Sequence, residues 1–333
     1  MSFVLPSGVW PTMITPFTPT GAVDFDGLNH LTEWYLSRGV DGLFAVCQSS
    51  EMFHLSLKEK REILRTIVTK VAGRCPVIAS GHTSDKLDDQ VEEIVAMNEA
   101  GADAVVLVTN RFGSQEGDER EWQADVESLL GRIPATIPLG LYECPHPFKR
   151  LLSSELLSWI LTTGRFFFVK DTSCHRRVQK ERAALCKGSS LRLYNANSTT
   201  LLSSLRSGYA GFSGVMANFH PELYVWICRK RSEFPVVAEQ LQALLGIASL
   251  IEGHGYPKNA KQFLAARGLP ITDVCRSIRN PLLDDWEEEL NQLHDLIELA
   301  PMQVHAGLGS LSGEEMLTRV SSGSWIQELK RVQ

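Results

Sequence analysis

The chain has 333 residues, of which 44% are hydrophobic and 22% are charged, so it can bury a large core and lacks the composition of a disordered or fibrous protein. Its net charge is -6 and no cluster of Lys and Arg stands out, which argues against nucleic acid as the main partner. No apolar run approaches the roughly 20 residues that span a bilayer, and the first residues do not form a secretory signal, so we expect a soluble protein without a membrane partner.

Short β-rich runs alternate with longer amphipathic segments along the first two thirds of the chain. The strand-like runs are Gly8–Thr15, Gly42–Val46, Pro76–Ala79, Ala104–Val108, Ile137–Leu141, Phe166–Val169, Leu191–Tyr194 and Gly211–Val215. The helices expected between them are Phe25–Arg38, Leu57–Val71, Lys86–Ala100, Glu119–Leu130, Ser154–Thr162, Arg177–Cys186 and Thr200–Ser207. Ser56 and Glu59 have the spacing of a capping box, and Gly101 follows the third helix as a C-cap.

Eight strands, each followed by a helix, predict parallel β/α units. Continuous apolar runs are typical of a parallel sheet that is buried on both faces. The size of the repeat favours a (β/α)8 TIM barrel over residues 1–222, which would carry the active site. The structural alternative is a doubly wound open sheet, but such sheets usually carry a Gly-rich turn after the first strand, and residues 14–17 (Ile-Thr-Pro-Phe) form no such turn.

Residues 223–333 are expected to form a C-terminal helical region packed on the barrel or on a neighbouring subunit. The expected helices are Glu222–Leu250, Pro257–Arg267 and Pro281–Leu299. A stripe at helical spacing in the third helix is interpreted as core packing. Its members are Leu283, Trp286, Leu290, Leu293 and Ile297. The tail forms either one more amphipathic helix at Gly313–Val332 or a mobile segment.

Seven cysteines and nine histidines are scattered along the chain. The cysteine count is odd and no pair has C-x-x-C spacing, which is typical of reduced thiols in a cytoplasmic protein. No helical His pair of the H-E-x-x-H kind occurs, so we expect neither a metal site nor a cofactor. Cys144, close after the fifth strand, is interpreted as a small buried filler, with an active-site thiol as the alternative.

Reactive side chains follow three of the strands, and the working residues of a barrel stand at the carboxyl ends of its strands. Lys170 ends an apolar strand, and a lysine in an apolar pocket stays neutral and nucleophilic, so that it can form an iminium with a ketone. The alternative is a lysine paired with Asp171. Tyr142 can relay the protons of such a reaction, while Ser49 and Ser50 can hold a carboxylate.

Several stretches carry a family resemblance by their order and spacing. They are "TMITPF", "SSE" followed by "HLSLKEK", "GADAVVLVT", "LYECP", "VKDTS" and "SGVMANFHP". From about Gly8 to Leu269 the sequence resembles the dihydrodipicolinate synthase / N-acetylneuraminate lyase family of class I Schiff-base aldolases. The resemblance implies a (β/α)8 barrel with a C-terminal helical region, commonly a homotetramer, that acts on pyruvate or another 2-oxo acid.

The resemblance also implies roles for individual residues. Lys170 matches the Schiff-base lysine, and Tyr142 matches the tyrosine that shuttles protons. Ser49 matches a residue whose hydroxyl and amide hold the keto-acid carboxylate. Gly214 and Val215 lie in the stretch whose backbone borders the keto-acid pocket.

Three positions depart from the pattern of the synthases in this family. Gln48 stands in place of the first threonine of the proton relay, and Phe112 in place of a tyrosine contributed across a subunit interface. Pro147 stands in place of the arginine that grips the carboxylate of the aldehyde substrate. These departures argue against the synthase of the lysine pathway.

We therefore expect a Schiff-base lyase, aldolase or dehydratase that acts on pyruvate or another 2-oxo acid together with an aldehyde or sugar-acid product, and that forms a homo-oligomer, either a dimer or a tetramer. One alternative is the synthase itself, with aldehyde recognition rebuilt around Lys149 or Arg150. Another is a keto-acid-binding sensor or scaffold with little turnover.

Other polar residues near the strand ends leave two interpretations open. His82 either contacts substrate or is satisfied by its neighbours. Asn195 and Asn197 either bind a polyhydroxylated substrate or cap the next helix. Glu143 and His146 are expected on a solvated face.

Overall fold

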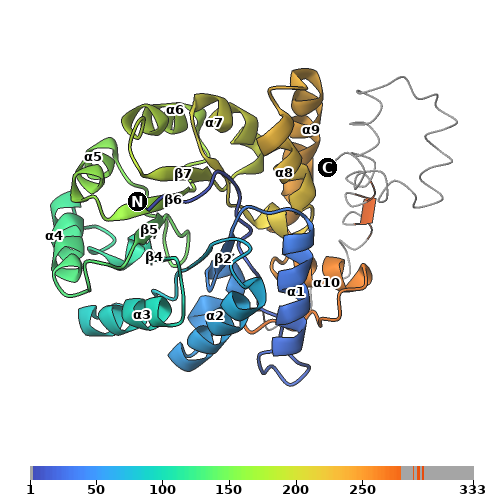
Figure 1. Ribbon diagram of the computed structural model, residues 1–333, viewed down its shortest axis with the longest axis horizontal. Helices are drawn as coiled ribbons and strands as arrows, with labels where there is room; N and C mark the ends of the chain where they lie inside the picture. Colours follow the sequence, from blue (N-terminus) through green and yellow to red (C-terminus); the bar gives the residue numbers. More distant parts are fainter. Residues whose placement is uncertain (1–2, 279–287, 289–290, 293–294, 296–333) are drawn as a thin grey trace, which may run out of the picture.

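The structure is a computed structural model that describes residues 3–278, 288, 291–292 and 295 (Figure 1). Strands and helices alternate through the first part of the chain. The strands are β1 (Gly8–Val9), β2 (Leu43–Ala45), β3 (Val77–Ala79), β4 (Ala104–Val108), β5 (Leu139–Tyr142), β6 (Phe166–Asp171), β7 (Arg192–Asn195) and β8 (Gly211–Phe212). The α-helices with bounds are α1 (Phe25–Ser37), α2 (Leu57–Val71), α3 (Leu87–Glu99), α4 (Glu119–Leu130), α5 (Ser154–Thr163), α6 (Arg176–Leu185), α7 (Leu201–Ser207), α8 (Pro221–Lys230), α9 (Pro235–Ala248) and α10 (Lys258–Ala266).

These bounds follow the expected elements closely, and the predicted capping box is present, since the Ser56 hydroxyl accepts from the Glu59 amide. The first strand is shorter than the expected run because Pro11 has no amide hydrogen to donate to a sheet. The stripe expected in Pro281–Leu299 and the helix expected at Gly313–Val332 lie outside the described residues.

The sheet is a ring of parallel strands. From β2 to β8 each strand pairs with the next in the sequence, and β8 pairs with β1. Two hydrogen bonds close the remaining gap, from the Met13 amide to the Phe44 carbonyl (2.9 Å) and from the Phe44 amide to the Pro11 carbonyl (3.0 Å). The structure therefore confirms the predicted (β/α)8 barrel rather than an open sheet.

Aromatic side chains fill the middle of the barrel. Phe168 stacks on Tyr194 with 4.5 Å between ring centroids, and it also contacts Trp10 (5.7 Å) and Phe44 (5.8 Å). All four rings are fully buried. Since alternate residues of a strand share a face, the side chain two residues after Phe168 also points into the barrel. That residue is Lys170, which therefore stands above a dry aromatic floor.

The expected helix Glu222–Leu250 is two helices. The chain leaves α8 after Lys230 and begins α9 at Pro235, because proline lacks an amide hydrogen and disfavours helix in the residue before it. α8 packs on β1 and β8 and so completes the ring of barrel helices. The expected boundary at residue 222 falls inside α8, and we propose that the C-terminal helical region begins after Lys230.

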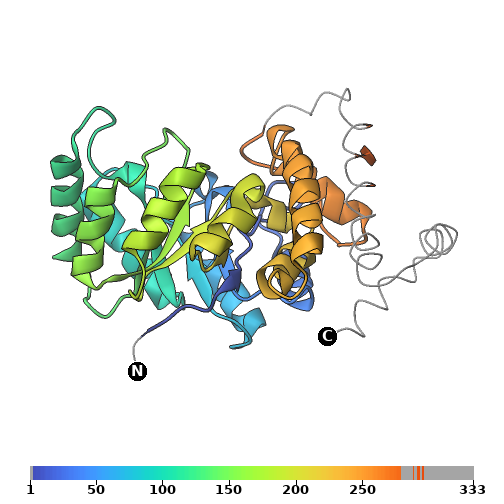
Figure 2. The ribbon, with the colours of Figure 1, turned by 90° about the horizontal axis from the view of Figure 1, so that it is seen from above.

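Residues Pro235–Gly253 are apolar and long enough to cross a membrane by length and composition, contrary to the expectation that no such run exists. This segment comprises α9 and the short helix η6 (Ser249–Gly253). The face of α9 that includes Leu241 and Leu245 is buried, and α9 packs on α7 and α8 beside the barrel (Figure 2). A core helix of a globular protein passes the same test of length and composition.

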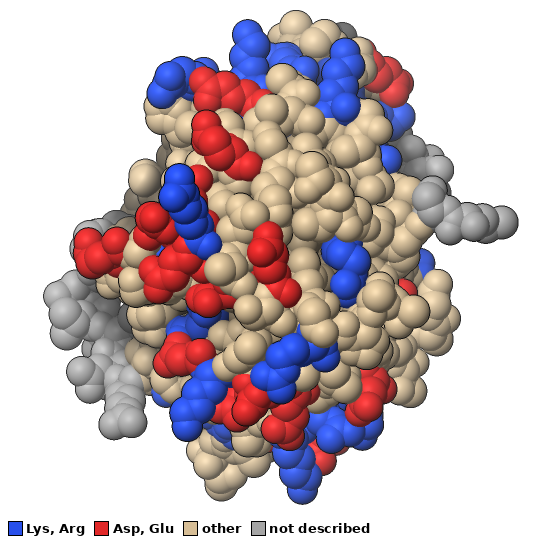
Figure 3. Space-filling view, turned by 90° about the vertical axis from the view of Figure 1, so that its left-hand side faces the viewer, with Lys and Arg blue, Asp and Glu red and all other residues tan. Residues whose placement is uncertain are grey.

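The opposite side of the barrel carries charges of both signs. Figure 3 shows Lys and Arg side chains among Asp and Glu side chains on the side that faces left in Figure 1, where α3, α4 and α5 lie. One pair there is Arg132 with Asp88 (2.5 Å), in which both side chains are largely exposed.

Candidate active site

A cavity of about 490 Å³ opens where the segments after β2, β5, β6 and β7 meet the C-terminal helical region. Both the strand ends and the segment after α9 contribute walls. The residues that line it are Gln48, Ser49, Glu51, Phe53, His54, Tyr142, Pro145, His146, Lys170, Thr172, Cys174, Ala196, Asn197, Val215, Glu252, Tyr256, Pro257, Ser277 and Ile278. Of the six residues predicted for the site, the cavity brings together Lys170, Tyr142, Ser49 and Val215.

Lys170 and Tyr142 are neighbours because β5 and β6 pair in a register that places them opposite each other. The Lys170 side chain is 3% exposed, and its Nζ lies 4.4 Å from the centroid of the Tyr142 ring and 6.0 Å from that of Phe44. Burial in this aromatic surrounding lowers the pKa of the Lys170 amine. A buried amine of lowered pKa is available as a neutral nucleophile.

The ion pair considered as the alternative for Lys170 does not form within the described residues. Asp171 instead contacts Arg182 (3.0 Å) and accepts a hydrogen bond from the Tyr209 hydroxyl. The cation that neutralises Asp171 is therefore Arg182, and the Lys170 amine is left facing the cavity.

The Tyr142 hydroxyl donates to the Gln48 side-chain oxygen at 3.1 Å. The Cys144 thiol donates to the same oxygen at 3.2 Å. Cys144 is buried, and burial raises the pKa of its thiol to about 11, which fits the expected filler better than a reactive thiolate. Burial likewise raises the pKa of Tyr142 well above its usual value, so the phenol keeps its proton.

A second hydroxyl network lies on the Ser49 side of the cavity. The Ser49 hydroxyl donates to the Thr12 hydroxyl at 3.1 Å, and Tyr256 lines the cavity together with Ser49. Tyr256 also accepts from the Asn218 amide at 2.9 Å. Ser49 is thus fixed by the Thr12 hydroxyl where it lines the cavity.

The other two predicted binding residues lie outside the cavity lining. The Ser50 hydroxyl donates to the Met13 carbonyl (2.6 Å) and accepts from the Cys47 amide (3.1 Å), so it fixes the turn instead of facing a ligand. A Cβ atom at Gly214 would come within 2.3 Å of the Phe212 ring and within 2.4 Å of the Ala196 carbonyl oxygen. Its role in this structure is to let two backbone segments approach closely.

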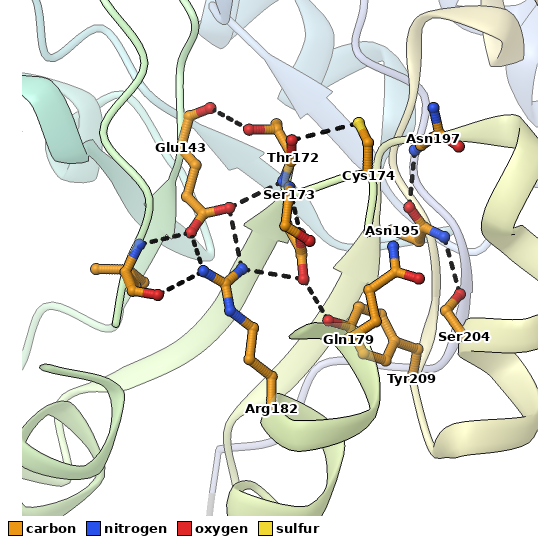
Figure 4. A network of polar contacts seen from close by, with 12 residues as sticks. Glu143, Thr172, Ser173, Cys174, Gln179, Arg182, Asn195, Asn197, Ser204 and Tyr209 are labelled. Atoms are coloured by element: carbon orange, nitrogen blue, oxygen red, sulfur yellow. Dashed lines mark hydrogen bonds and ion pairs between the residues drawn. The ribbon is translucent and has the colours of Figure 1, made fainter. Parts of the chain in front are cut away.

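A buried ionic network joins the ends of β5 and β6 to α6 (Figure 4). Arg182 of α6 contacts Glu143 (2.6 Å), which follows Tyr142, and Asp171 (3.0 Å), which follows Lys170. Glu143 also accepts from the backbone amide of Thr172 (2.9 Å). The expectation that Glu143 is solvated is wrong, because Arg182 is brought to it from the helix after the next strand.

Phe112, one of the positions that depart from the synthase pattern, packs inside the described structure. Phe112 is 1% exposed and packs between His82 (5.2 Å) and Trp122 (5.7 Å), so its ring faces the core of its own chain. His82 accepts from the Val108 amide at 3.0 Å and does not line the cavity. His82 is therefore held through Nδ1 only, because its buried Nε2 atom has no hydrogen-bond partner among the described residues.

No arginine is among the described residues that line the cavity. Pro147 does not line it, and neither do Lys149 and Arg150, the side chains considered as substitutes for the missing guanidinium. Arg150 instead donates to the Ser114 carbonyl. The described part of the site therefore contains no bidentate partner for a second carboxylate.

Three further polar residues were considered near the strand ends, and two of them, His146 and Asn197, line the cavity. His146 lines the cavity beside Phe53, with 4.9 Å between the ring centroids, although it was expected on a solvated face. Asn197 both lines the cavity and caps the next turn through the Thr200 amide. Asn195 is fully buried and donates to Ser204 (2.9 Å), so it has a structural contact only.

Sequence reasoning missed the contribution of the C-terminal helical region. Glu252 of η6 and Tyr256, with Pro257, form a wall of the cavity. Glu51 ties this region to the turn after β2, because its carboxylate contacts Lys261 (2.7 Å) and accepts from the Ser277 amide (2.7 Å). No periodicity in the sequence marks these residues, since their place depends on how the helices pack.

Comparisons with known proteins identify the family of this chain. A family model described as "Dihydrodipicolinate synthetase family" matches residues 5–300. A 4-hydroxy-tetrahydrodipicolinate synthase from Porphyromonas gingivalis is 28% identical over 278 residues, which cover 81% of this chain and 90% of that protein. The synthase of the same name from Clostridium perfringens is 28% identical over 220 residues, covering 66% of this chain and 72% of that protein.

A solved structure shows the same fold. It is that of YagE, a prophage protein of the dihydrodipicolinic acid synthase family from E. coli K12 in complex with pyruvate. It superimposes with a TM-score of 0.78 at 22% identity, covering 88% of this chain and 98% of that one.

Proposed function

Because the chain belongs to the dihydrodipicolinate synthetase family, whose members are Schiff-base-forming, pyruvate-dependent lyases of the class I aldolase type, we propose that its reaction runs through an iminium between Lys170 and a 2-oxo acid. The observation that carries this assignment is the Lys170 amine, which is 3% exposed, lies 4.4 Å from the Tyr142 ring and has no ion pair within the described residues. The pyruvate bound to the E. coli relative supports a 2-oxo acid as the substrate.

The proposed steps follow from these two side chains. The neutral Lys170 Nζ attacks the C2 carbonyl carbon, and the carbonyl oxygen takes a proton from Tyr142. The Tyr142 phenolate takes a proton from Nζ and passes it to the new hydroxyl group, which leaves as water and gives the iminium. In cleavage, the C4 hydroxyl gives its proton to the Tyr142 phenolate while the electrons of the C3–C4 bond flow into the iminium, so that an aldehyde departs and an enamine remains. Condensation is the reverse sequence.

Ser49 and Val215 are proposed to hold the 2-oxo acid. Ser49 presents its hydroxyl beside Tyr142 and Gln48, where the carboxylate next to C2 can accept it. Val215 borders the same side of the cavity. Ser50 and Gly214 are proposed to support this pocket through the backbone, since neither lines the cavity.

Synthase activity is the second candidate, and the names of the two relatives favour it. That reaction needs a partner for the carboxylate of the aldehyde, and a bidentate guanidinium would contribute roughly 1.5–3 kcal/mol. No arginine lines the described part of the cavity, so we propose an aldehyde without a carboxylate as the second substrate. An aldolase, a lyase and a dehydratase all share the proposed iminium.

Reductive trapping tests the proposal. Pyruvate and borohydride should add a mass to the intact protein, and peptide mapping should place it on Lys170. The Lys170→Ala variant should take up no mass and show no more than trace turnover, because the amine is the covalent centre. Labelling of the variant at the wild-type level would refute the mechanism. Labelling of the wild type without turnover of any aldehyde would instead favour a keto-acid sensor.

We also propose a cytoplasmic homo-oligomer, either a dimer or a tetramer. The seven cysteines are free in the structure, which supports a reducing compartment. Light scattering during size-exclusion chromatography would give the mass of the assembly.

A further inference from the structure

Glu252 carries an unpaired carboxylate oxygen inside the cavity that contains Lys170. Its Oε1 atom is buried and has no hydrogen-bond partner within the described residues. A buried acceptor without a partner costs free energy, and such groups usually serve a ligand or a function. The family reaction described above assigns no task to this carboxylate.

The surroundings of Glu252 place it on the wall where the far part of a substrate would lie. It lines the same cavity as Lys170 and Cys174. Asn197 lines this cavity too, and its side-chain oxygen is already occupied by the Thr200 amide. The wall formed by Cys174, Asn197 and Glu252 therefore offers a carboxylate acceptor beside an amide donor.

The other charged groups of the cavity are already committed. Glu51 is neutralised by Lys261 (2.7 Å), and Lys170 is the amine that we assign to the iminium. Burial raises the pKa of Glu252 to about 7, while the Lys170 amine acts in the opposite direction. Above that pH the wall is negative and has no guanidinium beside it within the described residues.

We propose that Glu252 is a substrate-binding residue that accepts a hydrogen bond from a hydroxyl group on the carbons beyond C3, so that the cavity takes 2-oxo acids with an uncharged polyhydroxylated tail and rejects those with a second carboxylate. This inference rests on the proposed iminium at Lys170. A cavity of about 490 Å³ is much larger than pyruvate requires and has room for such a tail. Selectivity then comes from a hydrogen bond to the hydroxylated tail and charge repulsion of the carboxylated one.

The test measures imine formation, which does not depend on which bond the enzyme later breaks. Three acids are titrated at about pH 8, where a carboxyl group of pKa about 7 is ionised. Pyruvate has no tail, 2-oxo-3-deoxygluconate has a hydroxylated tail, and 2-oxoglutarate has a carboxylated tail. Borohydride trapping on Lys170 gives the half-saturating concentration of each, and the ratio of each tailed acid to pyruvate isolates the effect of the tail. Any influence of Glu252 on the amine itself is common to all three acids and cancels in that ratio.

Wild-type protein should take the hydroxylated acid more readily than 2-oxoglutarate. In Glu252→Gln the half-saturating concentration of the hydroxylated acid, relative to that of pyruvate, should rise on the order of tenfold. The reason is that a neutral hydrogen bond is about half as strong as one to a charged group. The half-saturating concentration of 2-oxoglutarate, relative to that of pyruvate, should fall by a similar factor. Glu252→Asp keeps the charge and should still reject 2-oxoglutarate. Glu239→Gln, on an exposed ion pair of α9, is the matched control and should change neither ratio.

Two failures are distinguishable. If pyruvate is not trapped on Lys170 in the wild type, the proposed function is wrong, and this inference falls with it. If pyruvate is trapped but Glu252→Gln leaves both ratios within twofold of the wild type, the proposed function stands and Glu252 has no part in recognising the tail.

Discussion

Replacing Arg182 by methionine removes the cation at the centre of the buried network and leaves two carboxylates without it. Arg182 is 2% exposed and contacts Glu143 at 2.6 Å and Asp171 at 3.0 Å. Removing one partner of a buried ion pair costs about 3–5 kcal/mol, since the remaining charge stays buried. For 333 residues the entropy of unfolding is roughly 0.7 kcal/mol/K, so the midpoint of thermal unfolding should fall by roughly 4–7 °C.

The loss of stability in Arg182→Met should be larger at high pH than at low pH. Burial raises the pKa of Glu143, and Arg182 is the largest influence that opposes the rise. Without Arg182 the folded-state pKa of Glu143 lies further above its unfolded value, so the folded state binds the extra proton. Stability of the variant relative to the wild type should therefore decline as the pH rises from the unfolded pKa of Glu143 through its folded pKa.

Calorimetry at about pH 5.5 and about pH 8 checks both statements. Arg206→Met is the matched control, because Arg206 pairs with Glu239 on the surface and such pairs contribute less than about 1 kcal/mol. Adding Glu143→Gln to Arg182→Met should recover part of the loss and weaken its dependence on pH. A fall no larger than that of Arg206→Met, or a deficit equal at both pH values, would refute the reasoning.

Three further outcomes concern the cavity. Tyr142→Phe should still form the trapped adduct but turn over on the order of 10²–10⁴-fold more slowly, because a positioned acid–base group usually contributes that factor. Unchanged kinetics would remove Tyr142 from the mechanism. Tyr256→Phe should raise the half-saturating concentration of pyruvate in borohydride trapping by roughly 2- to 12-fold, because a hydroxyl that lines the cavity with Ser49 is lost. No change would mean that this hydroxyl does not support the pocket. At saturating pyruvate, kcat/KM for uncharged hydroxyaldehydes should exceed that for aspartate semialdehyde, and a preference of about tenfold for aspartate semialdehyde would overturn the interpretation of Pro147.

The barrel and its central lysine were accessible from the sequence because both depend on local patterns. Strand and helix periods alternate, and the run that ends in Lys170 is apolar up to the residue before it. Alternation along β6 then points Lys170 to the same face as Phe168, and the strand register places Tyr142 beside it. Such relations require only the order of the strands.

The residues that were misplaced depend on geometry that no local pattern records. Ser49 and Ser50 are adjacent, yet the turn sends one hydroxyl into the cavity and the other to the Met13 carbonyl. Glu143 has the appearance of a loop carboxylate, but its partner Arg182 lies 39 residues further along the chain. Glu252 reaches the cavity only because α9 and η6 pack beside the barrel.

Gln48 changes how the proton of Tyr142 can move. Its side-chain oxygen accepts from both Tyr142 (3.1 Å) and Cys144 (3.2 Å). An amide oxygen has no proton to pass on, and an amide nitrogen does not release one at neutral pH, so no relay runs through this residue. Phe112, buried against His82, offers no hydroxyl as an alternative. In the proposed mechanism, a proton that leaves Tyr142 therefore goes directly to the bound substrate or to water, because neither Gln48 nor Phe112 among the described residues can relay it.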